Sequence, residues 1–127
     1  MWKVTLLSSL VILMMGCQSS QNTPLDLLGK TLEYQYGEHI YHVTFDTDST
    51  LHWEAIGGDE MGLKAQEIYL SEWIDQDKLF ITWGEENGPG VSQILDFGEG
   101  QVHNHLLFGR EVRAGLGSIR FVDHPEY

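Results

Sequence analysis

Turn-forming residues divide the chain from residue 25 onward into short segments, and none of these segments keeps a helical repeat for three turns. Gly, Asp, Asn and Ser recur between runs that are rich in β-branched and aromatic residues, which is the pattern of β-strands. The runs predict strands at 31–36, 39–45, 50–55, 64–71, 79–83, 91–96, 101–108 and 118–122. Short strands at this spacing are typical of an all-β barrel or sandwich.

A set of about eight such strands closes readily into a barrel, which leaves no exposed edge and can hold one small ligand inside. We therefore predict an all-β fold, a small closed up-and-down β-barrel. The run at 64–71 would also suit a short helix, because Leu63, Gln66, Glu67 and Leu70 share a helical spacing. The glycine-containing segment 109–117 is expected to be a loop that precedes the last strand.

Composition excludes several classes of protein. The 127 residues include 7 Lys+Arg and 19 Asp+Glu, for a formal net charge of −12, so a nucleic-acid backbone would be repelled and no nucleic-acid partner is expected. The single cysteine, Cys17, rules out an internal disulfide framework and a cysteine-based structural zinc site. The length suits one domain. We expect no cofactor.

The N-terminal segment is predicted to be a targeting signal rather than part of the folded domain. In residues 1–16 (MWKVTLLSSLVILMMG), Lys3 precedes an apolar run, which is the layout of a secretory signal peptide. Residues 13–17 (LMMGC) resemble the bacterial lipobox, and this resemblance implies that Cys17 is lipidated. An ordinary signal peptide and a retained anchor helix are the alternatives.

The lipobox resemblance also implies a location and a domain layout. Gln18, rather than Asp, follows the cysteine, which implies sorting to the outer membrane, with the protein held by its lipid anchor and facing the periplasm. Residues 17–27 would form a lipidated tether because they include a polar stretch without pattern. The barrel domain would then occupy residues 28–127.

Three polar side chains are candidates for a site inside the barrel. Residues two apart on a strand share a face, so Tyr34 and Tyr36 lie together, as do Glu67 and Tyr69 on the fourth strand. Inside a cavity, the two phenols could bind an acid or a phenol, and a desolvated Glu67 carboxyl would be a candidate proton donor. The simpler alternative is ordinary strand tyrosines and a solvated glutamate, because a one-residue register shift exchanges the two faces.

Other candidates have both structural and functional interpretations. Trp53 and Trp83 are core aromatics or walls of a ligand pocket. Glu85 and Glu86 are predicted to lie in a solvated turn. Arg113 either balances nearby carboxylates or marks a site for an anionic ligand at the mouth of the barrel.

The histidines raise the question of a metal site. His103 and His105 would share one face of a strand, and His42, His52 and Glu54 could lie on neighbouring strands. None of them has the fixed spacing of a known metal motif. We therefore interpret the pair at 103 and 105 as surface histidines and predict no metal site.

Four segments, in order, resemble the bacterial phenolic acid decarboxylases and the related MoaF-like domains, both of which are lipocalin-like (calycin) barrels. These segments are 28–41 (LGKTLEYQYGEHIY), 51–58 (LHWEAIGG), 64–67 (KAQE) and 79–88 (LFITWGEENG). The resemblance covers about residues 28 to 122. It implies a closed barrel and is compatible with a dimer.

The resemblance also implies roles for individual residues. In the decarboxylases, two tyrosines hold the substrate carboxylate, and Tyr34 and Tyr36 match them. Glu67 matches the family's glutamate, which serves proton transfer. The family's arginine has no counterpart, because Glu54 occupies the matching position. An anion in place of a cation reverses the field felt by a bound carboxylate, so a hydroxycinnamate should bind poorly, and the MoaF-like branch is the better match.

These observations support two main hypotheses and one rival. The first is an envelope lipoprotein that binds a small apolar or aromatic ligand, with a site drawn from Tyr34, Tyr36, Trp53, Glu54, Glu67 and Trp83. The second is a decarboxylase-like or lyase-like enzyme acting on phenolic or related small acids, in which Glu67 donates the proton. The rival is a lipid-tethered accessory domain with a filled barrel that docks a partner protein.

Overall fold

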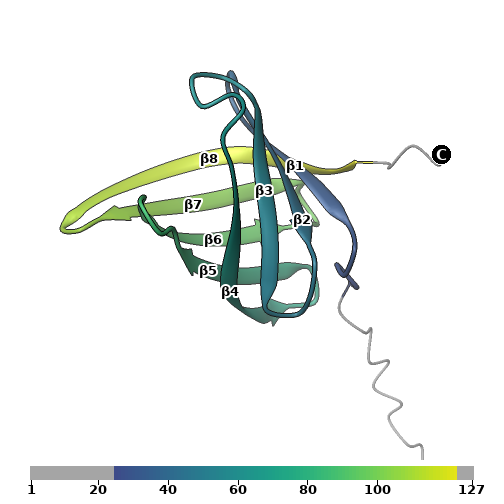
Figure 1. The fold of residues 1–127 in the computed structure, drawn as a ribbon. Helices are drawn as coiled ribbons and strands as arrows, with labels where there is room; N and C mark the ends of the chain where they lie inside the picture. Colours follow the sequence, from purple (N-terminus) through teal and green to yellow (C-terminus); the bar gives the residue numbers. More distant parts are fainter. Residues whose placement is uncertain (1–24, 123–127) are drawn as a thin grey trace, which may run out of the picture.

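The structure of the protein is a computed structural model that describes residues 25–122, so the predicted signal peptide, Cys17 and most of the tether lie outside the described residues. Eight antiparallel strands form a closed barrel in which each strand pairs with its sequence neighbours and the last pairs with the first (Figure 1). The strands are β1 (Thr31–Tyr36), β2 (His39–Phe45), β3 (Thr50–Gly57), β4 (Lys64–Asp75), β5 (Lys78–Gly84), β6 (Gly90–Asp96), β7 (Gln101–Phe108) and β8 (Glu111–Val122). The predicted all-β class and closed up-and-down barrel are confirmed. Within residues 25–122, no helix has the length and hydropathy of a membrane-spanning segment.

Two predicted segments differ in extent from the observed ones. The run at 64–71 is the predicted strand rather than the alternative helix, but β4 continues to Asp75. The prediction of a loop at 109–117 is wrong, because β8 begins at Glu111 and pairs with β7 along its length, from Phe108↔Glu111 to Gln101↔Ser118. The resulting β7–β8 hairpin is long and extends beyond the neighbouring strands at the left of Figure 1.

Gly117 in β8 allows close packing of neighbouring atoms rather than an unusual backbone conformation. A Cβ atom on Gly117 would lie 2.7 Å from the backbone oxygen of Gln35 and 2.7 Å from the ring of Tyr36. Gln35 pairs with Ser118 where β1 meets β8 and closes the barrel. The glycine therefore lets the two strands and the Tyr36 ring approach closely at this seam.

One end of the barrel is filled by apolar side chains. Alternation along each strand directs one set of residues inward, and eight of the largest are almost completely buried: Leu32, Tyr34, Val43, Phe45, Leu51, Ile81, Leu95 and Val102. The rings of Phe45 and Tyr69 meet edge to face with centroids 5.7 Å apart. This packed layer forms a floor beneath the other half of the barrel.

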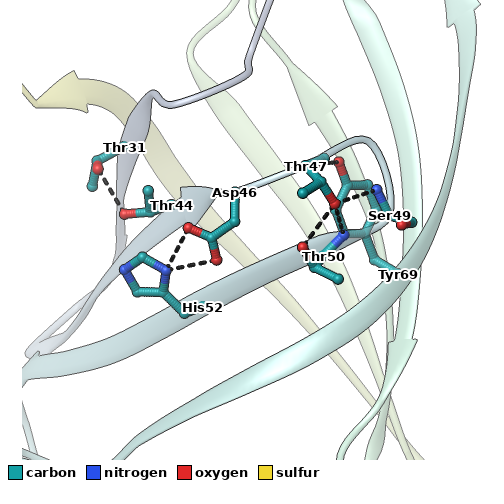
Figure 2. A network of polar contacts seen from close by, with 8 residues as sticks. All are labelled: Thr31, Thr44, Asp46, Thr47, Ser49, Thr50, His52 and Tyr69. Atoms are coloured by element: carbon teal, nitrogen blue, oxygen red, sulfur yellow. Dashed lines mark hydrogen bonds and ion pairs between the residues drawn. The ribbon is translucent and has the colours of Figure 1, made fainter.

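Hydrogen bonds stabilise the β2–β3 turn at the filled end (Figure 2). The Thr47 hydroxyl accepts bonds from the backbone N–H groups of Ser49 and Thr50, at 3.2 and 3.0 Å. The Tyr69 hydroxyl donates to the Thr47 carbonyl at 2.7 Å, which ties the turn to β4. Beside it, the Nδ1 atom of His52 lies 2.8 Å from the Asp46 carboxylate on the outer surface. These contacts hold the floor in place.

The opposite end is bounded by tight turns and two loops. Gly37, in the β1–β2 turn, and Gly109, in the β7–β8 turn, have φ angles of +61° and +60°. A glycine with positive φ at the first central position is the signature of a type II′ hairpin turn. Loop 58–63 joins β3 to β4, and loop 85–89 joins β5 to β6. These four connections surround the opening of the barrel.

Candidate functional site

A cavity of about 400 Å³ lies in the open half of the barrel. Buried side chains that line it are Tyr34, Val43, Trp83, Val91, Gln93 and Asn104, and the partly or fully exposed ones nearer the opening include Tyr36, Tyr41, Trp53, Glu60, Glu85, Phe108 and Arg113. The cavity exists because the inward side chains of the filled end stop short of the opening. Its volume lies within the range of small-molecule sites, which is about 300–1,000 Å³.

Three buried polar atoms on side chains that line this cavity have no hydrogen-bond partner of normal geometry. They are the hydroxyl of Tyr34, the indole nitrogen of Trp83 and the side-chain oxygen of Gln93. Each atom exposes less than 1 Å² of surface, so water does not compensate for the missing bond, and only the Trp83 nitrogen has a nearby carboxylate, that of Glu85. Since buried polar groups are nearly always paired in folded proteins, Tyr34 and Gln93 are candidates to turn toward a polar ligand atom.

A short hydrogen-bond chain fixes the polar side of the cavity. The Gln93 amide nitrogen donates to the Asn104 side-chain oxygen at 3.0 Å, and it lies 3.5 Å from the Tyr36 hydroxyl. These bonds orient the amide so that its oxygen stays free. Sequence reasoning missed both Gln93 and Asn104. The available signal was a polar residue at the inward position of an apolar alternation, as in Val91-Gln93-Leu95 and Val102-Asn104-Leu106.

Four of the predicted site residues, Tyr34, Tyr36, Trp53 and Trp83, do line the cavity. The Tyr34 and Tyr36 rings meet edge to face at 6.5 Å on the β1 wall. Burial raises the pKa of both hydroxyls, so both remain protonated hydrogen-bond donors at neutral pH.

Glu54 does not share this cavity, and its expected placement there is corrected. Its side chain is exposed on the outer face of β3, because Trp53 and Ala55 on either side of it point inward. The register pairs Glu54 with His42 and Lys64, which lie on the same outer surface. Its carboxylate therefore does not contact a molecule bound in the cavity.

Glu67 is buried inside the barrel but does not line the cavity. Its side chain is 6% exposed, and its carboxylate accepts a hydrogen bond from the indole nitrogen of Trp53 at 3.3 Å. Burial raises the pKa of Glu67, the Trp53 bond lowers it, and the charge of Glu86 raises it further. The Glu67 side chain is not among those that line the cavity, whereas Trp53, its hydrogen-bond donor, is.

Two carboxylates that sequence reasoning had not placed in the site lie at the opening. They belong to Glu85 and Glu60. Glu85 is half-buried and lines the cavity, whereas its neighbour Glu86 is exposed, as predicted for a solvated turn. Burial raises the pKa of Glu85, as do the charges of Glu67 and Glu60, while the nearby Trp83 indole lowers it. Glu60, from the β3–β4 loop, accepts a hydrogen bond of 2.6 Å from the Tyr41 hydroxyl. Loop residues of this kind carry no periodic signal in the sequence.

The histidines considered for metal binding do not form one cluster. His103 and His105 are exposed on the outer face of β7, His42 pairs with Glu33 at 3.2 Å, and His52 pairs with Asp46. Among residues 25–122, no three His, Cys, Asp or Glu side chains gather in an arrangement that could hold a metal ion.

Comparisons with known proteins agree with this architecture. A crystal structure described as that of "a putative beta-lactamase from Burkholderia vietnamiensis" superposes with a TM-score of 0.71 at 22% identity, covering 79% of this chain and 99% of that chain. At this identity the likeness shows the fold alone. A search of curated proteins gave no match. The sequence model of the family described as MoaF-like matches residues 28–119, nearly the whole barrel. The chain therefore belongs to the MoaF-like family.

Proposed function

We propose that this protein is an envelope lipoprotein whose barrel binds a small apolar or aromatic ligand that carries one polar group. The observation that supports binding is that Tyr34 and Gln93, two buried side chains that each carry an unpaired polar atom, line the same cavity. Leaving such an atom unpaired costs about 1–3 kcal/mol. A ligand hydroxyl at the inner end of the cavity would pair with one of these atoms once its side chain turns toward the ligand.

The walls of the cavity suit an aromatic or aliphatic body. Tyr36 meets Tyr41, and Tyr41 meets Trp53, edge to face at 6.3 and 6.0 Å, and Val43 and Val91 complete the apolar surface. Ligand sites are commonly built in this way, from apolar walls and a few convergent polar atoms. The polar side chains come from strands rather than from loops, so the backbone of the site needs little rearrangement to bind.

The test of binding is a cavity-blocking substitution. Gly115 lines the cavity, and a Cβ atom there would meet only the Tyr36 ring, at 4.0 Å. Gly115→Leu should therefore fold normally but fill ligand space. We expect 4-ethylphenol, a neutral aromatic probe with one hydroxyl, to bind the full chain in calorimetric titration, and Gly115→Leu to weaken this binding at least about tenfold.

Gly84→Leu is the matched control. Gly84 is exposed on the outer side of β5, has nothing within 4 Å of its Cβ position, and does not line the cavity. It adds the same side chain outside the barrel and should leave binding unchanged. Equal binding of the probe by both variants, or no saturable binding by the unaltered chain, would contradict a ligand site in the cavity and favour a docking domain.

Catalysis is the second candidate, and the buried Glu67 with its raised pKa is the observation in its favour. Glu67 does not line the cavity and its carboxylate already accepts a bond from Trp53, which favours binding without turnover. The name of the structural neighbour points to hydrolysis of β-lactams by that protein. At 22% identity that name does not carry over to this chain, and among residues 25–122 no serine nucleophile lines the cavity.

The lipid anchor is supported by the sequence around Cys17. We expect the mature protein to begin at Cys17, to carry acyl chains there, and to fractionate with outer membranes. Mass spectrometry of the N-terminal peptide checks the modification, and Cys17→Ser should release the protein into the soluble fraction. An unmodified N-terminal peptide from membrane-bound protein would contradict the anchor.

A further inference from the structure

The charge around the cavity opening is negative. Glu60 and Glu85 line it, and Glu67 and Glu86 act electrostatically on the same region. The pKa of Glu85 is raised because burial and the negative charges of Glu67 and Glu60 all disfavour its ionised form. Nearby positive charge therefore does not balance this carboxylate. At neutral pH this end of the cavity would gain from a positive charge.

The basic side chains at the opening offer little positive charge to a bound ligand. Of the side chains that line the cavity, only Arg113 and His39 are basic. The Arg113 guanidinium is already occupied, because its Nε and Nη2 atoms donate to Glu111 at 3.1 and 3.0 Å and its plane lies 4.8 Å from the Phe108 ring. An anionic ligand would therefore meet the two carboxylates without an uncommitted arginine to offset them.

The aromatic wall below the carboxylates suits a cation. Tyr36, Tyr41 and Trp53 line the cavity in successive edge-to-face contacts. The Tyr41 hydroxyl donates to Glu60 at 2.6 Å and the Trp53 indole donates to Glu67 at 3.3 Å. Donation to a carboxylate pushes electron density into the ring and makes its face more negative. Electron-rich aromatic faces attract ammonium groups, by about 0.5–2 kcal/mol per site.

We propose that the ligand of this cavity is an organic cation, with an amine or quaternary ammonium group held at the opening by Glu60, Glu85 and the Tyr41 and Trp53 rings. Its other end carries a hydrogen-bonding group that pairs with Tyr34 or Gln93. Tyr34 and Gln93 are more than nine-tenths buried, line the cavity and each carry a polar atom without a partner, which points to a ligand independently of the acidic residues. The inference rests on the proposed function and names its ligand class.

Three probes of the same shape test the charge preference. Tyramine is a cation, 4-ethylphenol is neutral and 3-(4-hydroxyphenyl)propionate is an anion, and all three carry the same phenol. We expect calorimetric titration of the full chain at neutral pH to show tyramine binding about tenfold more tightly than 4-ethylphenol, and the propionate more weakly than both. The preference should shrink as salt is added, because part of it is electrostatic.

Two neighbouring substitutions test whether the preference for tyramine depends on the Glu85 carboxylate. Glu85→Gln should remove most of the preference for tyramine and leave 4-ethylphenol binding within about twofold, since the side chain keeps its shape. Glu86→Gln removes the adjacent charge, which is exposed and does not line the cavity, and should keep most of the preference.

The outcomes separate the two proposals. If 4-ethylphenol binds and is blocked by Gly115→Leu, but tyramine binds no more tightly, the organic-cation inference is wrong and the ligand site stands. Equal effects of Glu85→Gln and Glu86→Gln would also overturn it, since the preference would then reflect net charge alone. If none of the three probes binds, the proposed function itself fails.

Discussion

Replacing Phe45 by alanine is expected to lower the free energy of unfolding by about 3–5 kcal/mol. Phe45 is 1% exposed in the packed floor of the barrel and meets Tyr69 edge to face at 5.7 Å. Its removal takes away a large apolar side chain and leaves a void that the strands on all sides cannot close. Urea unfolding followed by tryptophan fluorescence measures the change.

The matched control is Phe80→Ala, which makes the same chemical change on the outer face of β5. Phe80 is 41% exposed, so its loss should cost less than about 1 kcal/mol. The two variants should differ in midpoint and keep the same dependence on urea. Similar destabilisation of both would mean that the floor is not the stabilising core of this barrel.

Gly117→Ala is expected to destabilise the protein by about 1–3 kcal/mol, although it adds a single methyl group. The new Cβ would stand 2.7 Å from the Gln35 backbone oxygen and 2.7 Å from the Tyr36 ring. The oxygen cannot move unless β1 shifts against β8, where the barrel closes. Because Tyr36 lines the cavity, the same change should weaken binding of 4-ethylphenol.

Gly115→Ala tests whether the effect is local. Gly115 is two residues away on the same face of β8, and a Cβ atom there meets nothing closer than the Tyr36 ring at 4.0 Å. An alanine at an unstrained position stabilises a protein by about 0.4–1 kcal/mol, through the entropy of the unfolded chain. We therefore expect opposite signs for the two substitutions in parallel urea titrations. Two alanines of equal and small effect would show that the seam tolerates side chains at position 117.

Local patterns were enough to predict most strands. The boundaries of β1, β2 and β7 follow directly from alternation and from Gly37 and Gly109, which permit sharp turns. The start of β8 could not be predicted in this way, because its glycines look like a loop until β7 lies beside them. Gly117 belongs to the strand for a reason that only the nearby Gln35 backbone reveals.

The alternation of inward and outward residues along the strands predicted part of the candidate site. Tyr34 and Tyr36 share a face by spacing, and Trp83 follows the inward alternation of β5. Trp53 and Glu54 are adjacent, so one of them had to leave the cavity, and the sequence did not say which. In the barrel Trp53 points inward and Glu54 points to solvent.

The sequence by itself determined the class of fold, because turn residues and alternating apolar positions act over a few neighbours along the chain. The tertiary structure decided which side chains share the cavity. Gln93, Asn104 and Glu85 meet Tyr34 there although they come from distant segments. Their meeting depends on strand register and on closure between β1 and β8, which are set by the packing of the whole barrel rather than by any one segment.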